Sequence, residues 1–145
     1  MSKQQPSEEE TVNSLLVEIR VLEGTFNELS ARQNLLERAF LESRAALDAI
    51  KGLSESTSDE VLTQIGGGAM LRAPRPSTDR ILVSIASSVV IEKPKDEAVA
   101  FLEERARDVE KTIVSILGQR NEIAERLNSD RQILNNYVAR QGQQE

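Results

Sequence analysis

Apolar side chains recur at a spacing of three and four residues along the first third of the chain. Twelve positions follow this spacing, and all but two are apolar: Val12, Leu15, Ile19, Leu22, Phe26, Leu29, Gln33, Leu36, Phe40, Ser43, Leu47 and Ile50. Such a heptad seam predicts a long helix that coils with another helix instead of lying on a broad core. Pro6 and the Ser7-x-x-Glu10 capping box are expected to begin this helix, and Lys51-Gly52 to end it.

The last third of the chain repeats this pattern. Its twelve seam positions are again apolar with two exceptions: Val99, Leu102, Ala106, Val109, Ile113, Ile116, Arg120, Ile123, Leu127, Asp130, Leu134 and Tyr137. Pro94, followed by Asp96 and Glu97, suits the start of a helix, and Gly142 lies after the last periodic residue. At roughly 45 residues, each helix would be about 67 Å long. The predicted fold class is therefore mainly α, an antiparallel coiled-coil hairpin of two matched helices with both termini at its far tip.

Four polar residues interrupt these seams, and two glycines lie elsewhere within the predicted helices. The polar seam residues are expected either to set the register of the helix pair or to face solvent. Gly24 and Gly118 lie inside the two helices, where glycine costs about 1 kcal/mol relative to alanine. The two glycines therefore mark places where the helices are expected to bend.

Between the helices the pattern changes to one typical of β-hairpins. A polar connector over residues 53–60 precedes β-branched and turn residues, which predict four strands: Val61–Ile65, Ala69–Ala73, Arg80–Ala86 and Val89–Lys93. Gly66-Gly67-Gly68 and Ser87-Ser88 would turn the two hairpins. The chain thus divides into residues 1–60, 61–93 and 94–145, which we expect to form a helix, a β-platform and a helix within one domain.

The β-platform is expected to assemble with other chains. Ile81, Val83 and Ile85 share one face of the third strand, and Leu82 with residues 89–91 supplies apolar side chains to the other. About 33 residues of hairpin cannot cover two faces and two edges by themselves. The missing cover is therefore expected to come from neighbouring subunits.

Composition argues against an enzyme. The chain has no Cys and no His, and only 3% of its residues are aromatic, so thiolate nucleophiles, the usual zinc ligands and the best proton-transfer side chain are missing. The glycines at 66–68 are not followed by the Lys and helix of a phosphate-binding loop. Adjacent carboxylates such as Glu103 and Glu104 do not share a helix face. We therefore expect no catalytic residues, no metal site and no cofactor.

Charge and hydropathy limit the partners and the location. The net charge is −6, and the acids lie mainly in the predicted helices, so a nucleic-acid partner is unexpected. No stretch approaches the roughly 20 apolar residues that span a bilayer, and residues 1–10 lack an apolar signal core. A cytoplasmic location without membrane contact is the expectation.

Some apolar residues lie outside the heptad seams. Those near the predicted tip are Leu16, Val17, Val21, Ile133 and Val138, and similar residues occur at Leu35, Leu41, Phe101 and Leu117. Exposed apolar surface on a rod suggests contact with another molecule. The sequence is equally compatible with an alternative, in which wide seams and helix ends carry additional aliphatic side chains that bind no partner.

The middle segment and the start of the second helix resemble the α-class subunit of archaeal prefoldin. The matching stretches are Ile65-Gly66-Gly67-Gly68-Ala69-Met70-Leu71-Arg72-Ala73, Thr78-Asp79-Arg80-Ile81-Leu82-Val83-Ser84-Ile85, Val89-Val90-Ile91-Glu92-Lys93 and Asp96-Glu97-Ala98-Val99-Ala100-Phe101-Leu102. The resemblance implies a hexamer of two α-class and four β-class subunits. It also implies coiled-coil tips that hold unfolded client proteins without ATP and pass them to a group II chaperonin.

The resemblance assigns two sets of residues. Clients would bind at the tips through Val12, Leu15, Leu16, Ile19, Leu127, Ile133, Leu134, Tyr137 and Val138. Subunits would assemble through Ile65, Met70, Leu71, Ile81, Val83, Ile85, Val89 and Ile91. One departure concerns the second hairpin, where Ala86-Ser87-Ser88 replaces the glycines of the family and leaves the turn type and register open. The main alternative function is a coiled-coil adaptor or tether that binds one folded partner.

Overall fold

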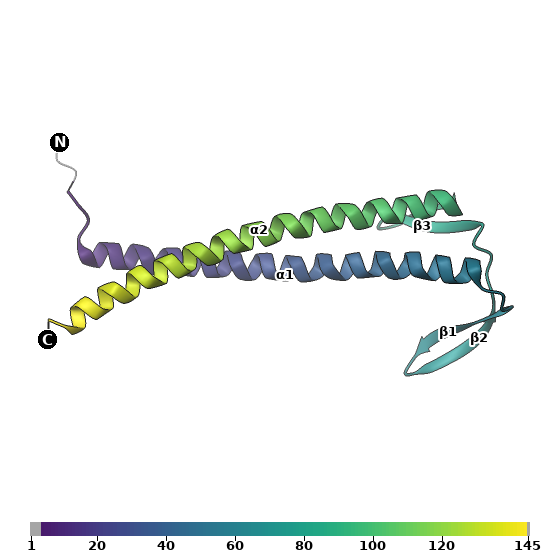
Figure 1. Ribbon diagram of the computed structural model, residues 1–145, viewed down its shortest axis with the longest axis horizontal. Coiled ribbons are helices and arrows are strands. Elements are labelled where there is room, and N and C mark those ends of the chain that lie inside the picture. The colour runs from purple at the N-terminus through teal and green to yellow at the C-terminus, as the bar shows by residue number, and fades with distance from the viewer. Residues whose placement is uncertain (1–3, 145) are drawn as a thin grey trace. The chain divides into compact units, whose positions relative to one another are not determined.

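The computed structural model describes residues 4–144 and contains two long helices and two β-hairpins (Figure 1). The elements follow in the order α1 (Glu8–Glu55), β1 (Glu60–Gly66), β2 (Ala69–Pro74), β3 (Arg80–Ala86), β4 (Val89–Pro94) and α2 (Lys95–Gly142). Each helix has 48 residues. The prediction of a mainly α fold with two long helices and a four-stranded insert is confirmed.

The two ends of α1 differ in how well the sequence predicted them. At the start, the Ser7 amide donates to Glu10 Oε2 at 2.9 Å and the Glu10 amide to Ser7 Oγ at 3.2 Å, which is the expected capping box. The prediction that Gly52 ends the helix is wrong, because α1 continues to Glu55. Gly52 does not adopt the positive φ of a terminating glycine, and the Ser56 amide donates to its carbonyl at 3.0 Å.

The chain forms two compact units. Unit 1 comprises Met1–Glu37 with Lys111–Glu145, and unit 2 comprises Arg38–Glu110. In unit 1 the two helical stretches run antiparallel, and their cores lie at seam positions: Leu15, Ile19, Ile116 and Leu127 are buried. In unit 2, Ile50 and Ala106 continue the buried seams, and Ala98, one position off the seam, is fully buried. The 3-4 spacing therefore identified nearly all of the buried helical positions.

The two hairpins are structural repeats offset by 20 residues. Hairpin 1 (β1 and β2, residues 60–74) pairs Glu60 with Pro74, and hairpin 2 (β3 and β4, residues 80–94) pairs Arg80 with Pro94 in the same antiparallel register. Each register shifts at one position before the turn, at Ile65 and Ile85. Four equivalent positions also carry identical residues, namely Asp59 and Asp79, Leu62 and Leu82, Ile65 and Ile85, and Pro74 and Pro94.

The turns of the two hairpins differ in backbone conformation. Gly66, Gly67 and Gly68 have φ values of 110°, 58° and 80°, whereas no described non-glycine residue, Ser87 and Ser88 included, has a positive φ. Glycine adopts positive φ without the steric cost that a Cβ adds. The serines of hairpin 2 therefore change the turn conformation, but they leave the register of the strands the same as in hairpin 1.

Candidate functional site

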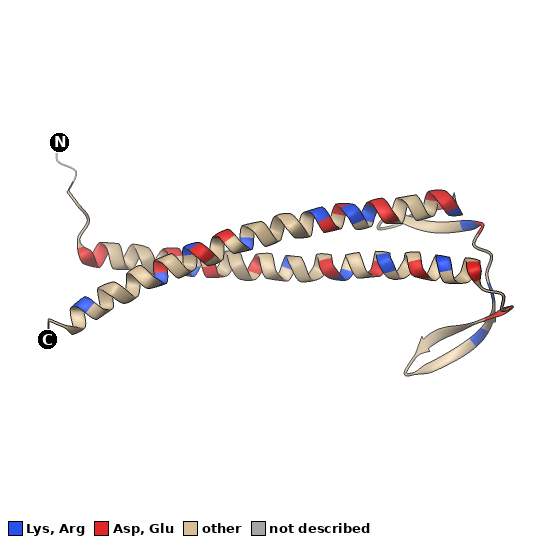
Figure 2. Ribbon diagram, viewed as in Figure 1, with Lys and Arg blue, Asp and Glu red and all other residues tan. Residues whose placement is uncertain are grey.

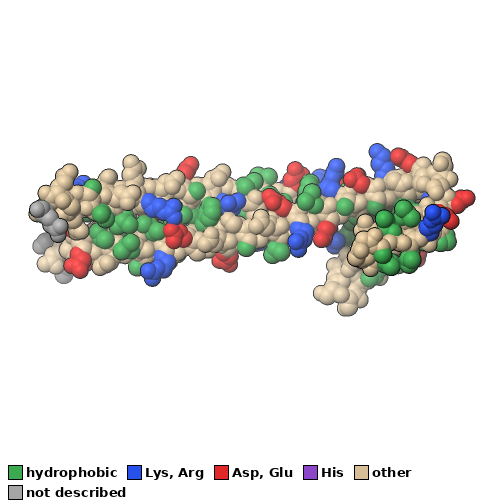
Figure 3. All heavy atoms as spheres, turned by 90° about the horizontal axis from the view of Figure 1, so that it is seen from below, with side chains coloured by type: hydrophobic (Ala, Val, Ile, Leu, Met, Phe, Trp, Pro, Cys, Tyr) green, Lys and Arg blue, Asp and Glu red, His purple; other side chains and the backbone are tan. Residues whose placement is uncertain are grey.

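Unit 1 exposes aliphatic side chains beside its buried seam. The exposed residues near the ends of the helices are Leu16, Val17, Val21, Ile133 and Val138. Val17, Val21 and Val138 are each 60 to 61% exposed. Figure 3 shows hydrophobic side chains along both helices of unit 1 and a second cluster over the hairpins of unit 2. Unit 1 therefore offers apolar surface without any rearrangement of its helices.

The structure places the nine predicted client-binding residues in three environments. Leu15 and Ile19 (9% exposed) and Leu127 (5% exposed) are buried in the seam. Val12, Leu134 and Tyr137 are half-buried, and Leu16, Ile133 and Val138 are exposed. The a and d positions thus hold the helices together, while off-seam positions face outward. The predicted client-binding set omitted the exposed Val17 and Val21, although their off-seam spacing had already marked them as apolar residues near the tip.

A shallow groove lies beside these residues in unit 1. It has a volume of about 330 Å³ and is lined by Glu23, Phe26, Asn27, Ala124, Leu127, Asn128 and Arg131. Arg131 donates to Glu23 across the two helices at 2.6 Å, at the edge of this groove. Phe26 and Leu127 give the groove an apolar floor, so it extends the apolar surface of unit 1 along the helix pair.

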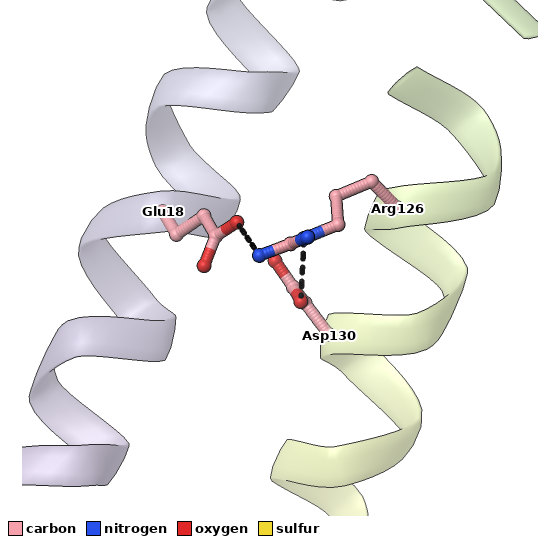
Figure 4. A network of polar contacts seen from close by, with 3 residues as sticks. All are labelled: Glu18, Arg126 and Asp130. Atoms are coloured by element: carbon pink, nitrogen blue, oxygen red, sulfur yellow. Dashed lines mark ion pairs between the residues drawn. The ribbon is translucent and has the colours of Figure 1, made fainter. Parts of the chain in front are cut away.

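Ion pairs cross the helix interface of unit 1. Arg126 Nη2 lies 2.7 Å from Glu18 Oε1 on α1, and its Nε lies 3.5 Å from Asp130 Oδ1 on α2 (Figure 4). The Asp130 side chain is only 4% exposed, and its Oδ2 has no hydrogen-bond partner. A pair between exposed side chains contributes about 0 to 1 kcal/mol, so we expect the Arg126–Glu18 contact to orient the helices more than to stabilise them.

A second polar cluster occupies the seam of unit 1. Arg120 Nη1 donates to Gln33 Oε1 at 2.5 Å, and Gln33 Nε2 donates to Glu37 Oε1 at 2.8 Å. The Arg120 guanidinium also lies 4.7 Å from the centre of the Phe26 ring. Gln33, like the polar seam residues Ser43 and Asp130, is buried. The alternative that these three seam residues face solvent is therefore wrong, and the pairing of Gln33 with Arg120 fits a role in setting register.

Hairpin 2 packs on the start of α2. Val83 on its inner face is 5% exposed, and Arg105 Nη2 donates to the Ser84 carbonyl at 3.1 Å. Lys93 and Arg105 both lie over the Phe101 ring, with distances of 5.9 and 4.8 Å to its centre. The helix thus covers one face of this hairpin with Phe101 and Arg105, and Lys93 of β4 lies over the same ring.

Hairpin 1 is attached at its base and is open along its length. Arg75, just after β2, donates through Nη1 to the Leu53 carbonyl at 3.1 Å. Thr63 and Leu71, the counterparts of Val83 and Ile91, are exposed. The inner face of hairpin 1 therefore lacks the cover that α2 gives to hairpin 2.

Most of the predicted interface residues are exposed in the single chain. These are Ile65, Met70, Leu71, Ile85, Val89 and Ile91, with exposed fractions between 39 and 60%. Ile81 is half-buried, and Val83 is buried within its own chain. Leu82 and Val90, which lie within the predicted assembly segment Ile81–Ile91, are exposed by 70 and 60%, and Leu62, which was not predicted, is exposed by 65%. For Leu82, the alternation with the half-buried Ile81 and the buried Val83 along β3 is the signal that marks the outward face.

The described residues also limit the kinds of site available. Among residues 4–144, no three His, Cys, Asp or Glu side chains come together in a way that could hold a metal ion. A bilayer-spanning helix would need a longer uncharged apolar stretch than the described residues of α1 and α2 provide.

Comparison with known proteins identifies the family. The sequence profile of the family described as "Prefoldin subunit" matches residues 22–139, which is most of the chain. The chain belongs to the prefoldin family. Prefoldin is a chaperone family, so this chain is a prefoldin-type chaperone subunit.

Relatives of known name support the α class. The chain is 29% identical over 130 residues to the prefoldin subunit alpha of Nitrosopumilus maritimus, with 90% of each chain covered. It is 33% identical over 135 residues to the prefoldin subunit alpha of Methanoculleus marisnigri, with 88% of each covered. It is also 36% identical over 100 residues to that of Methanoregula boonei, covering 64% of this chain and 65% of the relative.

The fold agrees with a solved prefoldin structure. A chain of the filamentous PFD from Methanocaldococcus jannaschii, determined by cryo-EM, superimposes with a TM-score of 0.65. The match covers 77% of this chain and 93% of that chain at 18% identity. At this identity the likeness concerns the fold, and it agrees with two long helices joined through small hairpins.

Proposed function

We propose that this α-class prefoldin subunit acts as an ATP-independent holdase that binds non-native proteins through unit 1 and delivers them to a group II chaperonin. The observation that carries the proposal is the set of exposed aliphatic side chains beside the seam of unit 1. Unfolded chains expose apolar side chains irregularly, and a surface of separate aliphatic groups can accept them without a defined pocket. Delivery to a chaperonin rests on membership of the family.

The proposal assigns the client surface to the exposed residues first. Leu16, Val17 and Val21 on α1 and Ile133 and Val138 on α2 are accessible in the closed helix pair. The half-buried Val12, Leu134 and Tyr137 extend this surface. Leu15, Ile19 and Leu127 contribute to it indirectly, since they hold the helices that carry the exposed residues.

Assembly is the second part of the proposal. Open hairpin faces support association with other subunits, and we propose a cytoplasmic hexamer of two α-class and four β-class chains. Several client surfaces would then act on one unfolded chain, and their combined avidity would exceed the affinity of any single surface. Co-expression with a β-class subunit and mass measurement of the complex test this stoichiometry.

A substitution set in unit 1 tests client binding. Replacing Leu16, Val17, Val21, Ile133 and Val138 together by Ser or Thr removes the exposed aliphatic groups. We expect the assembled complex to lose most of its protection of a denatured client from aggregation, measured by light scattering without ATP. The matched control replaces Leu41 by Ser, since this leucine is exposed by 65% and belongs to unit 2.

Three outcomes distinguish the holdase from the adaptor. Loss of protection in the unit 1 variant but not in the control supports the holdase. Equal protection by the unit 1 variant and the unchanged protein would contradict the assigned surface. Saturable binding of a single folded protein, without protection of several unrelated clients, would favour the adaptor instead.

A further inference from the structure

Asparagine is concentrated at one kind of position in unit 1. Eight seam positions of α1 (residues 12–36) and eight of α2 (residues 113–137) are each followed directly by one residue. Of these sixteen residues, six are asparagine: Asn13, Asn27, Asn34, Asn121, Asn128 and Asn135. The sixteen residues that directly precede the same seam positions include one, Asn136. All seven asparagines of the chain lie in unit 1, and residues 38–110 contain none.

The stability of the helices does not explain where these asparagines lie. Asparagine is a weak helix former and is favoured in turns, yet the segment that forms both hairpin turns contains no asparagine. All seven side chains are exposed. Hydrogen bonds between the helices of unit 1 join Gln33 to Arg120 and Glu23 to Arg131, and within residues 4–144 no asparagine side chain forms a hydrogen bond. The asparagine amides are therefore available to another molecule.

Two ion pairs show that the six asparagines lie on one flank of the helix pair. Glu23 and Arg131, which each directly follow a seam position, lie 2.6 Å apart. Glu18 and Arg126, which each directly precede a seam position, lie 2.7 Å apart (Figure 4). Residues that follow the seam on α1 thus face those that follow it on α2. We call these sixteen residues the asparagine flank.

The groove of unit 1 lies in the asparagine flank. Asn27 of α1 and Asn128 of α2 both line it, together with Phe26 and Leu127 of the seam. The groove therefore offers an apolar surface between amide groups from both helices. Such a surface suits a ligand that has apolar side chains on a polar main chain.

The asparagine flank has no net charge. Its charged residues are two bases, Arg20 and Arg131, and two acids, Glu23 and Glu37. Figure 2 shows few charged residues along the last turns of α2, where Arg140 is the one charged residue of 132–142. The exposed aliphatic residues of the flank are Leu16, Val114, Leu117 and Val138. A neutral occupant with apolar side chains is therefore favoured over a strongly acidic or basic partner.

We propose that the asparagine flank binds the main chain of an extended, non-native polypeptide. An asparagine amide both donates and accepts hydrogen bonds, as each peptide unit does. Folded proteins pair most peptide groups internally, whereas an extended chain leaves them open to a partner. Asn27 and Asn34 are seven residues apart in α1, a rise of about 10.5 Å, which is the length of about three residues of extended chain. The amides can therefore bind one extended segment at repeated points.

This inference rests on the proposed function and deepens it, because it names the part of the client that is recognised. The exposed aliphatic residues contact client side chains, and the asparagines contact client peptide groups. Peptide groups are the same in every protein, so this contact does not depend on the sequence of the client. Several such hydrogen bonds, each exchanged for bonds to water, add affinity without a defined pocket.

A triple alanine variant tests the role of the amides. Asn121→Ala, Asn128→Ala and Asn135→Ala remove three amides of the flank from α2. Alanine is more apolar and a better helix former than asparagine, so weaker binding cannot come from a less stable helix or from lost apolar surface. We expect the full-length chain to bind reduced, carboxymethylated α-lactalbumin about tenfold more weakly, measured by fluorescence anisotropy of the labelled client. Thermal unfolding followed by circular dichroism is expected to show a raised midpoint.

Two matched variants serve as controls. Gln119→Ala, Gln132→Ala and Asn136→Ala remove three exposed amides of the same helix that lie outside the flank, and we expect them to leave the affinity for the client unchanged. Replacing the three asparagines of the triple alanine variant by Gln instead keeps an amide at each position and also improves helix propensity. We expect this glutamine variant to keep most of the affinity of the unchanged chain.

A change in the client tests main-chain recognition directly. A short unstructured peptide rich in Leu and Ala is compared with an analogue in which every second peptide bond is an ester. The ester keeps the side chains and removes the N–H donors. We expect the unchanged chain to bind the ester analogue about tenfold more weakly than the peptide, measured by competition with the labelled client. The triple alanine variant is expected to show a smaller difference between the two.

The outcomes distinguish this inference from the proposed function. Equal affinity of the unchanged chain for the peptide and its ester analogue would overturn main-chain recognition. Equal client binding by the triple alanine variant and the unchanged chain would overturn the role of the asparagines, as would an equally large loss in the control outside the flank. The holdase would still stand if the aliphatic variant of unit 1 loses client binding in the same assay. Failure of the unchanged chain to bind any of these probes would contradict both proposals.

Discussion

Hairpin 1 and hairpin 2 share register, bulge position and length, yet one is covered by its own chain and the other is open. In hairpin 2, Val83 is buried and Arg105 donates to the Ser84 carbonyl at 3.1 Å. In hairpin 1 the counterpart of Val83 is Thr63, which is exposed. The two hairpins therefore share a backbone but differ in exposure. The side chains at equivalent positions decide which faces are covered within the chain and which stay exposed.

The largest expected effect comes from placing a charge at the covered position. Val83→Asp puts a carboxylate on the face packed against α2, where burial without a partner is unfavourable. We expect the free energy of local opening of hairpin 2 to fall by about 3 kcal/mol, measured by hydrogen exchange of the β3 and β4 amides. Thr63→Asp, the same change at the equivalent exposed position, is expected to alter the exchange of hairpin 1 by less than about 0.5 kcal/mol. Equal effects at the two sites would contradict the difference in cover.

The sequence predicted the fold more fully than the surfaces. Heptad spacing identified both helices, and the alternation and turn residues identified the four strands to within a residue or two. The end of α1 was misplaced because Gly52 keeps a helical backbone, and glycine alone does not specify a positive φ. The pattern could not distinguish Val83 from Ile85, since both lie on the same strand and only packing against α2 buries one of them.

The client-binding residues show the same limit. A heptad pattern marks Leu15, Ile19 and Leu127 as apolar and periodic, and those properties place them inside the helix pair. The residues that face outward, such as Val17 and Val21, are recognised by their departure from the pattern. Off-seam apolar positions therefore predict a site of exposed apolar residues better than seam positions do.

A smaller effect is expected from the helix side of the contact. Arg105→Ala removes the hydrogen bond to the Ser84 carbonyl and the guanidinium 4.8 Å from the Phe101 ring centre. We expect the free energy of opening of hairpin 2 to fall by about 1 kcal/mol, again by hydrogen exchange, while hairpin 1 is unchanged. Arg107→Ala, at an exposed arginine of the same helix, is the control. A comparable loss in the control would mean that helix charge, and not the contact, supports hairpin 2.

The smallest effect is expected at the turns, where the two hairpins differ in backbone rather than in cover. Gly67 has a φ of 58°, and nothing lies within 4 Å of an added Cβ, so Gly67→Ala costs only backbone strain. We expect hairpin 1 to lose about 1 kcal/mol of local stability, whereas Ser87→Ala at the equivalent position, where φ is not positive, changes hairpin 2 by less than about 0.5 kcal/mol. Hydrogen exchange of the four strands measures both. If Gly67→Ala lowered the local stability of hairpin 1 as little as Ser87→Ala lowers that of hairpin 2, hairpin 1 could adopt the turn of hairpin 2. The glycines would then not be required for its register.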